Sequence, residues 1–217
     1  MLDRFSWRSY DLRNVLPAGW EADISKLADE AVKKVLRPLS VTSREGDPDI
    51  RIPVLTVNGQ VIREQLRWLY DMYKGYFRDL AQLGMSEPVS TADNDIYGVV
   101  LNVQRGSAMR YECHVDSNPI EGLLYVTEHP PGTGGDLVVA NRTAASSVED
   151  VDADCSVVYP QRGNLLFFDA RRFPHYVRPL TDPQGIRIAV AMNFYTPSCP
   201  ESARPGDLTG HLFGYEQ

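Results

Sequence analysis

The sequence has no long apolar run and few cysteines, and each shortage excludes a class of protein. Its longest apolar runs, such as 188–192, are far shorter than the roughly 20 residues that cross a bilayer. The first residues mix polar and apolar types, so we expect no signal peptide and no membrane partner. The three cysteines, Cys113, Cys155 and Cys199, are widely spaced. That pattern argues against a disulfide framework and favours a reducing, cytoplasmic location.

Positive charge is also scarce. The 22 Lys and Arg residues against 29 Asp and Glu residues give a formal net charge of -7. Nucleic-acid-binding proteins usually present a basic face, so we expect no nucleic-acid partner. A length of 217 residues with 43% hydrophobic content is ordinary for a soluble globular protein. Because no repeat or low-complexity linker interrupts the chain, we expect one domain over 1–217.

The first part of the chain, residues 1–95, carries helical patterns. Apolar residues recur at helical spacing over 24–35, and a longer apolar stripe runs over 66–80. Between them, 55–62 contains an Asn-Gly pair flanked by apolar residues, which is typical of a short hairpin. The sequence therefore predicts a helical N-terminal support with one hairpin.

From residue 96 the pattern changes to short strands separated by Gly, Pro, Asp and Asn. Eight strands in a row without a helical pattern between them favour a double-sheet jelly roll over a parallel α/β sheet. We therefore predict a mainly β fold, a double-stranded β-helix over 96–196, buttressed on one outer face by the N-terminal helices. Residues 197–217 form a C-terminal extension. The predicted strands lie near 96–104, 109–114, 121–127, 136–140, 155–159, 164–168, 175–180 and 186–195.

Two histidines and one carboxylate form a candidate metal site. Side chains two residues apart on an extended segment point the same way, so His114 and Asp116 can reach one metal ion. His175 opens another predicted strand directly after an apolar one and can supply the third ligand. Two histidines and a carboxylate are the set that holds non-haem Fe(II) on one face and leaves positions open. The alternative is a His-x-Asp pair that arose by chance in a surface loop.

Arg187 is a cation inside an apolar strand. If 181–185 form a turn, Pro179 faces Arg187, and directly opposed residues share a sheet face. Arg187 would then point to the same side as His175, roughly 13 Å along the backbone. A metal-chelating diacid and an arginine side chain can together bridge that gap. The alternative is an arginine paired with a structural carboxylate.

Residues 98–196 resemble the Fe(II)- and 2-oxoglutarate-dependent dioxygenases, specifically their prolyl-4-hydroxylase-like branch. The resemblance implies that His114, Asp116 and His175 bind Fe(II), that Arg187 holds the distal carboxylate of 2-oxoglutarate, and that Tyr125 assists Arg187. It also implies O2 as a second co-substrate and allows ascorbate a supporting role. The matching segments, in the family's order, are Gly106, Tyr111 to Asp116, Leu123 to Val126, Gly134 to Leu137, Gly163 to Phe168, Pro174 to Val177, and Gly185 to Arg187.

The sequence departs from the family's pattern in two places. Gln104 stands roughly where several prolyl hydroxylases have another co-substrate tyrosine, and the spacing from His175 to Arg187 is a few residues longer than in many members. Related halogenases replace the metal-binding carboxylate with a small residue so that chloride can bind. Because Asp116 is present, the resemblance implies hydroxylation rather than halogenation, with desaturation or ring formation left open.

Residues outside the metal set are weaker candidates. Arg142 and Asn118 are candidate substrate contacts, although an arginine after a strand is more often a solvated strand end. Glu112 has the same parity as His114 and can either face the pocket or pair with Arg110 or Arg187. His129 lies in a Pro-flanked segment, where we expect it to be exposed and not a ligand.

Three functions remain open. The first is an oxygenase that couples oxidative decarboxylation of 2-oxoglutarate to hydroxylation, or a related C–H oxidation, of a small polar metabolite such as an amino acid or natural-product intermediate. The second is a hydroxylase of prolyl or other residues in a protein. The third is a non-catalytic jelly-roll binding protein, which the metal triad and Arg187 together disfavour.

Overall fold

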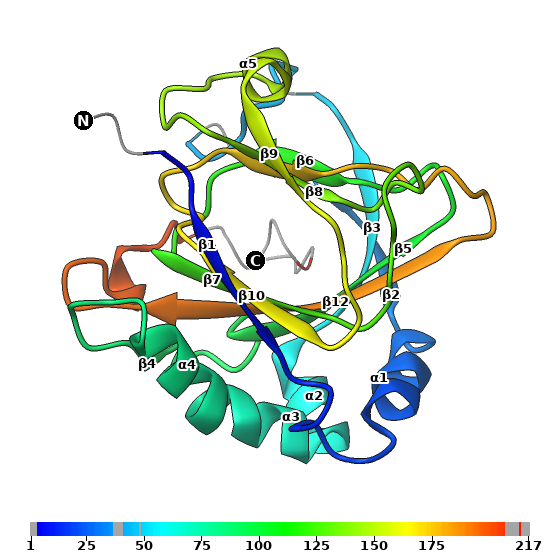
Figure 1. Ribbon diagram of the computed structural model, residues 1–217, viewed down its shortest axis with the longest axis vertical. Coiled ribbons are helices and arrows are strands. Elements are labelled where there is room, and N and C mark those ends of the chain that lie inside the picture. The colour runs from blue at the N-terminus through cyan, green and yellow to red at the C-terminus, as the bar shows by residue number, and fades with distance from the viewer. Residues whose placement is uncertain (1–3, 37–40, 48, 207–212, 214–217) are drawn as a thin grey trace.

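The structure, a computed structural model, describes residues 4–36, 41–47, 49–206 and 213. Its described strands form two antiparallel sheets that face each other (Figure 1). The larger sheet has the order β1-β10-β7-β12-β5-β3-β2, with β4 paired to β12, and the smaller has the order β6-β11-β8-β9. The strands are β1 (Trp7–Asp11), β2 (Val32–Leu36), β3 (Ile52–Val57), β4 (Ser90–Thr91), β5 (Val99–Arg105), β6 (Tyr111–His114), β7 (Ile120–Tyr125), β8 (Leu137–Ala140), β9 (Cys155–Val158), β10 (Asn164–Phe168), β11 (His175–Val177) and β12 (Ile186–Tyr195).

Apolar residues on alternate strand positions fill the space between the two sheets. Leu123 and Tyr125 of β7 and Leu166 and Phe168 of β10 meet Val139 of β8 in one buried cluster. Side chains alternate between the faces of a strand, so the intervening residues point to the outer side of the larger sheet. This two-sided burial explains why the strands are so apolar.

Helices cover the outer faces of both sheets (Figure 1). The first four, with the π-helical turn η1 (Tyr73–Phe77), pack on the larger sheet through a cluster that includes Ile24, Leu69 and Phe77. Val151 of α5 packs on the smaller sheet. The helices are α1 (Trp20–Ala28), α2 (Gly59–Gln65), α3 (Arg67–Met72), α4 (Arg78–Gln82) and α5 (Val148–Ala153), followed by the 3-10 turn η2 (Glu201–Ala203). Among the described residues, no helix is long and apolar enough to cross a membrane.

All eight strands predicted from residue 96 onward are present, and the helices expected to buttress one face do so. The sequence pattern missed α5, which lies between β8 and β9 on the other sheet. Its six residues are too few for a clear helical period. It also missed β1, β2, β4 and the first half of β3, so residues before 96 contribute to the larger sheet as well as supporting it.

The predicted helix over 24–35 is only half right. Helix α1 ends at Ala28, and β2 begins at Val32 and pairs with β3. Apolar residues at 31 and 35 continue the helical spacing by coincidence, because the β-branched Val32 and Val35 belong to an exposed edge strand. Pairing with β3 outweighs the periodicity.

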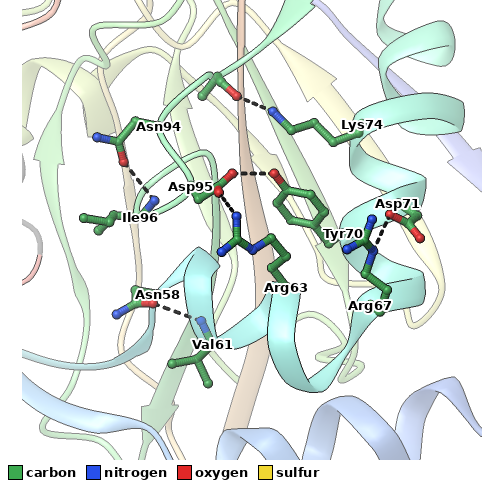
Figure 2. Close-up of polar contacts among 11 residues, drawn as sticks. Asn58, Val61, Arg63, Arg67, Tyr70, Asp71, Lys74, Asn94, Asp95 and Ile96 are labelled. Carbon is green, nitrogen blue, oxygen red and sulfur yellow. Dashed lines mark hydrogen bonds and ion pairs between the residues drawn. The ribbon is translucent and has the colours of Figure 1, made fainter.

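The predicted hairpin over 55–62 is wrong. Strand β3 ends at Val57, and Asn58 is the N-cap of α2, where its side-chain oxygen accepts a hydrogen bond from the backbone N–H of Val61 at 3.2 Å (Figure 2). Asn58 has φ of -77°, whereas the favoured hairpin turn requires a positive φ. Asparagine is favoured both in tight turns and at helix N-caps, so the Asn-Gly pair does not distinguish a hairpin from the start of a helix.

Asp95 fastens the helical layer to the loop that precedes β5. Arg63 of α2 and the hydroxyl of Tyr70 of α3 both donate to its carboxylate (Figure 2). Gly59 lies against the backbone oxygens of Asp95 and Val99, so closely that a Cβ at this position would clash with them. These contacts hold the helices on the outer side of the sheet whose inner side lines the pocket.

Candidate metal centre and pocket

The two candidate histidine ligands lie directly opposite each other in the smaller sheet. His114 ends β6 and His175 begins β11, and the two are register partners with ring centroids 4.5 Å apart. Asp116 follows β6, and its backbone N–H donates to the carbonyl of Ala170 at 2.9 Å. One possible ligand atom from each of the three lies within 4.8 Å of the other two. The structure therefore brings the predicted set together.

The hydrogen bonds of the two rings direct one nitrogen of each toward the same point. Nδ1 of His114 lies 2.8 Å from the carbonyl of Glu112, and Nδ1 of His175 lies 3.0 Å from the carbonyl of Phe173. The Nε2 atoms lie 3.1 Å and 3.9 Å from the two oxygens of Asp116. A metal-bound histidine usually donates its other ring N–H to a carbonyl in this way, which fixes the ring orientation.

The charges of the three residues are strongly linked. Burial alone would lower the pKa of His114, but the hydrogen bond and negative charge of Asp116 raise it to about 9. Burial and the neighbouring charge of His114 lower the pKa of His175 to about 4. Near neutral pH His114 is therefore in its charged form beside Asp116, whereas His175 is neutral.

The cluster opens into a pocket between the two sheets. Its walls come from both sheets and include Arg187 of β12, which is only 2% exposed. The guanidinium Nε donates to the carbonyl of Gly135 at 2.7 Å, and Cζ lies 5.7 Å from the ring centre of Tyr125. Burial lowers the pKa of Arg187.

Arg187 reaches the pocket by another route than the sequence suggested. The predicted hairpin between 175–180 and 186–195 is wrong, because β11 belongs to the smaller sheet and β12 to the larger. Arg187 pairs in register with Gln104 of β5, not with Pro179. The loop between β11 and β12 crosses from one sheet to the other, so Arg187 and His175 face each other across the interior.

Two buried polar side-chain atoms near Arg187 have no hydrogen-bond partner. In the part of the chain that the structure describes, no carboxylate forms an ion pair with Arg187. The hydroxyl of Tyr125 and Oε1 of Gln104 are buried there without a hydrogen-bond partner. Unpaired buried polar groups cost free energy, so this end of the pocket is suited to an anion with acceptor and donor capacity.

Of the other predicted site residues, some line the pocket and one does not. Asn118 lines the pocket and is 3% exposed, and Glu112 also lines it, while Arg110 pairs with Glu45 instead. Arg142 does not line the pocket: its exposed side chain pairs with Asp154 at 2.8 Å, as expected for a strand end.

The prediction that His129 is exposed is wrong. Its side chain is buried, with Nε2 3.1 Å from both the Thr127 hydroxyl and the Ile186 carbonyl. The candidate metal cluster of the described residues does not include it. The Pro-flanked segment looked like a loop, but it packs against the start of β12 beside Arg187.

Sequence reasoning missed several polar residues of the pocket wall. These are Asn102 on β5, Tyr111 on β6, Glu121 on β7 and Asn193 on β12. Each is a polar or amphipathic residue in an apolar strand, and that is the signal that could have found them. Segment 41–47 was also missed: the carbonyl of Thr42 accepts from Val115, between two of the candidate ligands.

Comparison with known proteins shows a match to one family model and a similarity of fold to several solved structures. Residues 99–195 match the model of the 2OG-Fe(II) oxygenase superfamily. No curated protein sequence matches the chain significantly. AviO1 from Streptomyces viridochromogenes Tue57 is 14% identical over 94% of each chain, with a TM-score of 0.64.

Two further solved structures share the fold. The non-heme alpha ketoglutarate dependent carbocyclase SnoK of nogalamycin biosynthesis is 14% identical, with a TM-score of 0.65 over 98% of this chain and 88% of that one. A prolyl hydroxylase from Trichoplax adhaerens, in complex with a hypoxia inducible factor peptide fragment, is 16% identical, with a TM-score of 0.57 over 88% and 84%. The predicted jelly-roll fold is thereby confirmed.

Proposed function

We propose that the protein hydroxylates, or otherwise oxidises at C–H, a small polar metabolite, on the premise that residues 99–195, which match the model of the 2OG-Fe(II) oxygenase superfamily, form an oxygenase of that superfamily. The single observation that carries the proposal is the pairing of the His114, Asp116 and His175 cluster with an unpaired buried Arg187 in one pocket. A protein that only bound a ligand would have no need of both features.

The donor set fits an iron ion. His114, Asp116 and His175 would hold Fe(II) through two Nε2 atoms and one carboxylate oxygen, which leaves positions on the metal open. When bound, iron supplies the oxidation chemistry that couples decarboxylation of 2-oxoglutarate with O2 to oxidation of the substrate. The residues themselves bind and orient, and their Nδ1 hydrogen bonds keep both rings fixed.

The end of the pocket at Arg187 fits the distal carboxylate of 2-oxoglutarate. We propose that the free guanidinium nitrogens of Arg187 and the hydroxyl of Tyr125 bind this carboxylate, which would satisfy polar atoms that are otherwise unpaired. Gly135 supports this geometry, because its carbonyl holds Nε of Arg187. Its φ of +74° is one that only glycine adopts easily.

A small substrate suits the pocket better than a protein segment. Its walls are strand residues from both sheets, and segment 41–47 pairs with the free edge of β6 beside the cluster. Hydroxylation of a peptidyl residue is the alternative. We also propose a reducing, cytoplasmic location, which the three unpaired cysteines favour.

The proposal is tested by measuring succinate. Purified protein is incubated with Fe(II), ascorbate, 2-oxoglutarate and O2, together with pools of amino acids, other metabolites or peptides. We expect one metabolite pool to stimulate succinate formation above the uncoupled background. Stimulation by peptides alone would favour the alternative, and no Fe(II)-dependent binding of 2-oxoglutarate would refute the enzyme.

The ligand assignment has a sharper test in Asp116→Ala, which we expect to abolish turnover because one of three metal ligands is lost. Asp79→Ala is the matched control, since Asp79 lies on α4 with a 66% exposed side chain. Full activity of Asp116→Ala would refute the assignment.

A further inference from the structure

The pocket contains a buried carboxylate that neither the metal set nor the co-substrate uses. Glu121 lies on β7, lines the pocket and is only 6% exposed. It is the register partner of Asn193 on β12, and both side chains point into the space between the sheets. The pair lies on two central strands of the eight-stranded sheet.

Glu121 lacks a counter-ion. Asn118 donates from its amide to one Glu121 oxygen at 3.1 Å, and the backbone N–H of Met192 donates to the carboxylate as well. No Lys, Arg or His among the described residues forms an ion pair with it. Burial and the nearby charge of Asp116 raise the pKa of Glu121 well above its usual range. A bound cation would favour the ionised form of this buried carboxyl and form an ion pair with it.

Asp116 belongs to the proposed metal set, so the pocket has two further carboxylates, Glu112 and Glu121. Glu112 lies on β6 of the smaller sheet, whereas Glu121 lies on β7 of the larger sheet. Arg187 and Asn193 lie at opposite ends of the inward face of β12, about 20 Å apart at roughly 3.3 Å per residue. Glu121 therefore marks the end of the pocket away from the co-substrate, on the side of the metal cluster where Asp116 and Asn118 lie.

We propose that Glu121 determines specificity by binding the positively charged nitrogen group, an ammonium or guanidinium, of a small-molecule substrate. Asn118 is a positioning residue, because its amide donates to the Glu121 carboxylate and to the backbone carbonyl of Ile120. The inference rests on the proposed function, since it takes the pocket of the metal cluster as the active site. It names the substrate class that the proposed function leaves open.

The test compares ligands that differ only in charge. Hexylammonium, hexylguanidinium and neutral 1-hexanol are titrated into protein loaded with Mn(II) and 2-oxoglutarate, and the dissociation constants are measured by NMR. We expect the wild-type protein to bind at least one of the two cations at least tenfold more tightly than the alcohol. In Glu121→Gln the preference should fall to within twofold. Glu64→Gln, the same change at an exposed position of α2, should keep the preference.

Two further measurements distinguish a failure of the proposed function from a failure of the role assigned to Glu121. Binding of 2-oxoglutarate should be equal in wild-type protein, Glu121→Gln and Glu64→Gln, and its absence from the wild type would refute the proposed function rather than the role of Glu121. If Glu121→Gln does not fold, Asn118→Ala should lower the cation preference at least threefold. Equal affinity of the wild type for all three probes, or a preference that survives in Glu121→Gln, would overturn the inference. Tighter binding of a lysine-containing peptide than of either cation would overturn its small-molecule part.

Discussion

The two faces of β12 carry side chains of very different size and polarity. The outward side chains are large and apolar and pack under the helices, whereas the inward ones are polar at the ends and small in the middle. The outward set is Ile188, Val190, Met192 and Phe194. The inward set is Arg187, Ala189, Ala191 and Asn193. Because the two alanines occupy little volume, space remains between the polar ends, so one strand contributes stability on one side and a binding pocket on the other.

Truncating an outward side chain should cause the largest effect, a loss of folding stability. Phe194 is fully buried, with its ring 5.3 Å from that of Tyr73 and 5.7 Å from that of Phe167. We expect Phe194→Ala to lower the free energy of unfolding by about 3–5 kcal/mol, measured by chemical denaturation. Leu83→Ala, at a 66% exposed position, should change it by less than about 0.5 kcal/mol. Equal losses in both variants would contradict the division between the faces.

Replacing an inward side chain should weaken the binding of 2-oxoglutarate and leave the stability of the fold nearly unchanged. Arg187→Met removes the cation that is proposed to hold the distal carboxylate, while the metal ligands remain. We expect the dissociation constant of 2-oxoglutarate to rise roughly 100-fold, about 2.7 kcal/mol, measured by calorimetry with Mn(II) present. The melting temperature should fall only slightly, because Arg187 has no ion pair among the described residues and its removal breaks one buried hydrogen bond, to the carbonyl of Gly135.

The matched control is Arg105→Met. Arg105 lies on the neighbouring strand β5, and its exposed side chain pairs with Asp29 at 2.8 Å. It should bind 2-oxoglutarate as the wild type does. An equally large loss in this variant would show that the effect is not local to Arg187.

The inward side should also respond to pH. A metal must displace the proton that His114 holds with a pKa of about 9, whereas His175 is already neutral, since its pKa is about 4. Affinity for Mn(II) should therefore rise with pH, roughly tenfold per unit between about pH 6 and 8, by competition between metal and proton. A flat profile would mean that the proton on His114 is not the one displaced.

The smallest effect belongs to the helical layer under the outward face. Asn58→Ala removes the side-chain acceptor that caps α2 (Figure 2). We expect a loss of about 1 kcal/mol in the free energy of unfolding, with binding of 2-oxoglutarate unchanged. Asn58→Asp keeps an acceptor and should be close to the wild type. A change in binding in the alanine variant would show that the two faces are coupled.

The strands of the core were predictable from sequence, because alternation and turn residues report directly on them. The proximity of His114 and Asp116 was predictable as well, since residues two apart on an extended segment point the same way, but the addition of His175 needed the family resemblance. The assignment of each strand to one of the two sheets was not predictable. A short loop of turn residues after His175 is typical of a hairpin, yet it connects strands of different sheets. Local pattern does not encode which sheet a strand joins.

Helix and strand were confused where the local signal fits both. Asn58 can begin a turn or cap a helix, and the apolar residues up to Val35 fit a helical period although β2 pairs with β3. Glu121 was missed for another reason. Its importance comes from what surrounds it in the fold, a pocket without a counter-ion, and no residue near it in sequence shows this.

The strand order also governs how the protein can fold. Strand β12 lies between β7 and β5 at the middle of the larger sheet, and β1 pairs with β10 although residues 12–163 separate them in the chain. The sheet therefore cannot close until its late-synthesised central strand is available. A topology dominated by such distant pairings has a high contact order, so folding should be slow, and the apolar edges of β7 and β5 should stay open to aggregation until β12 arrives.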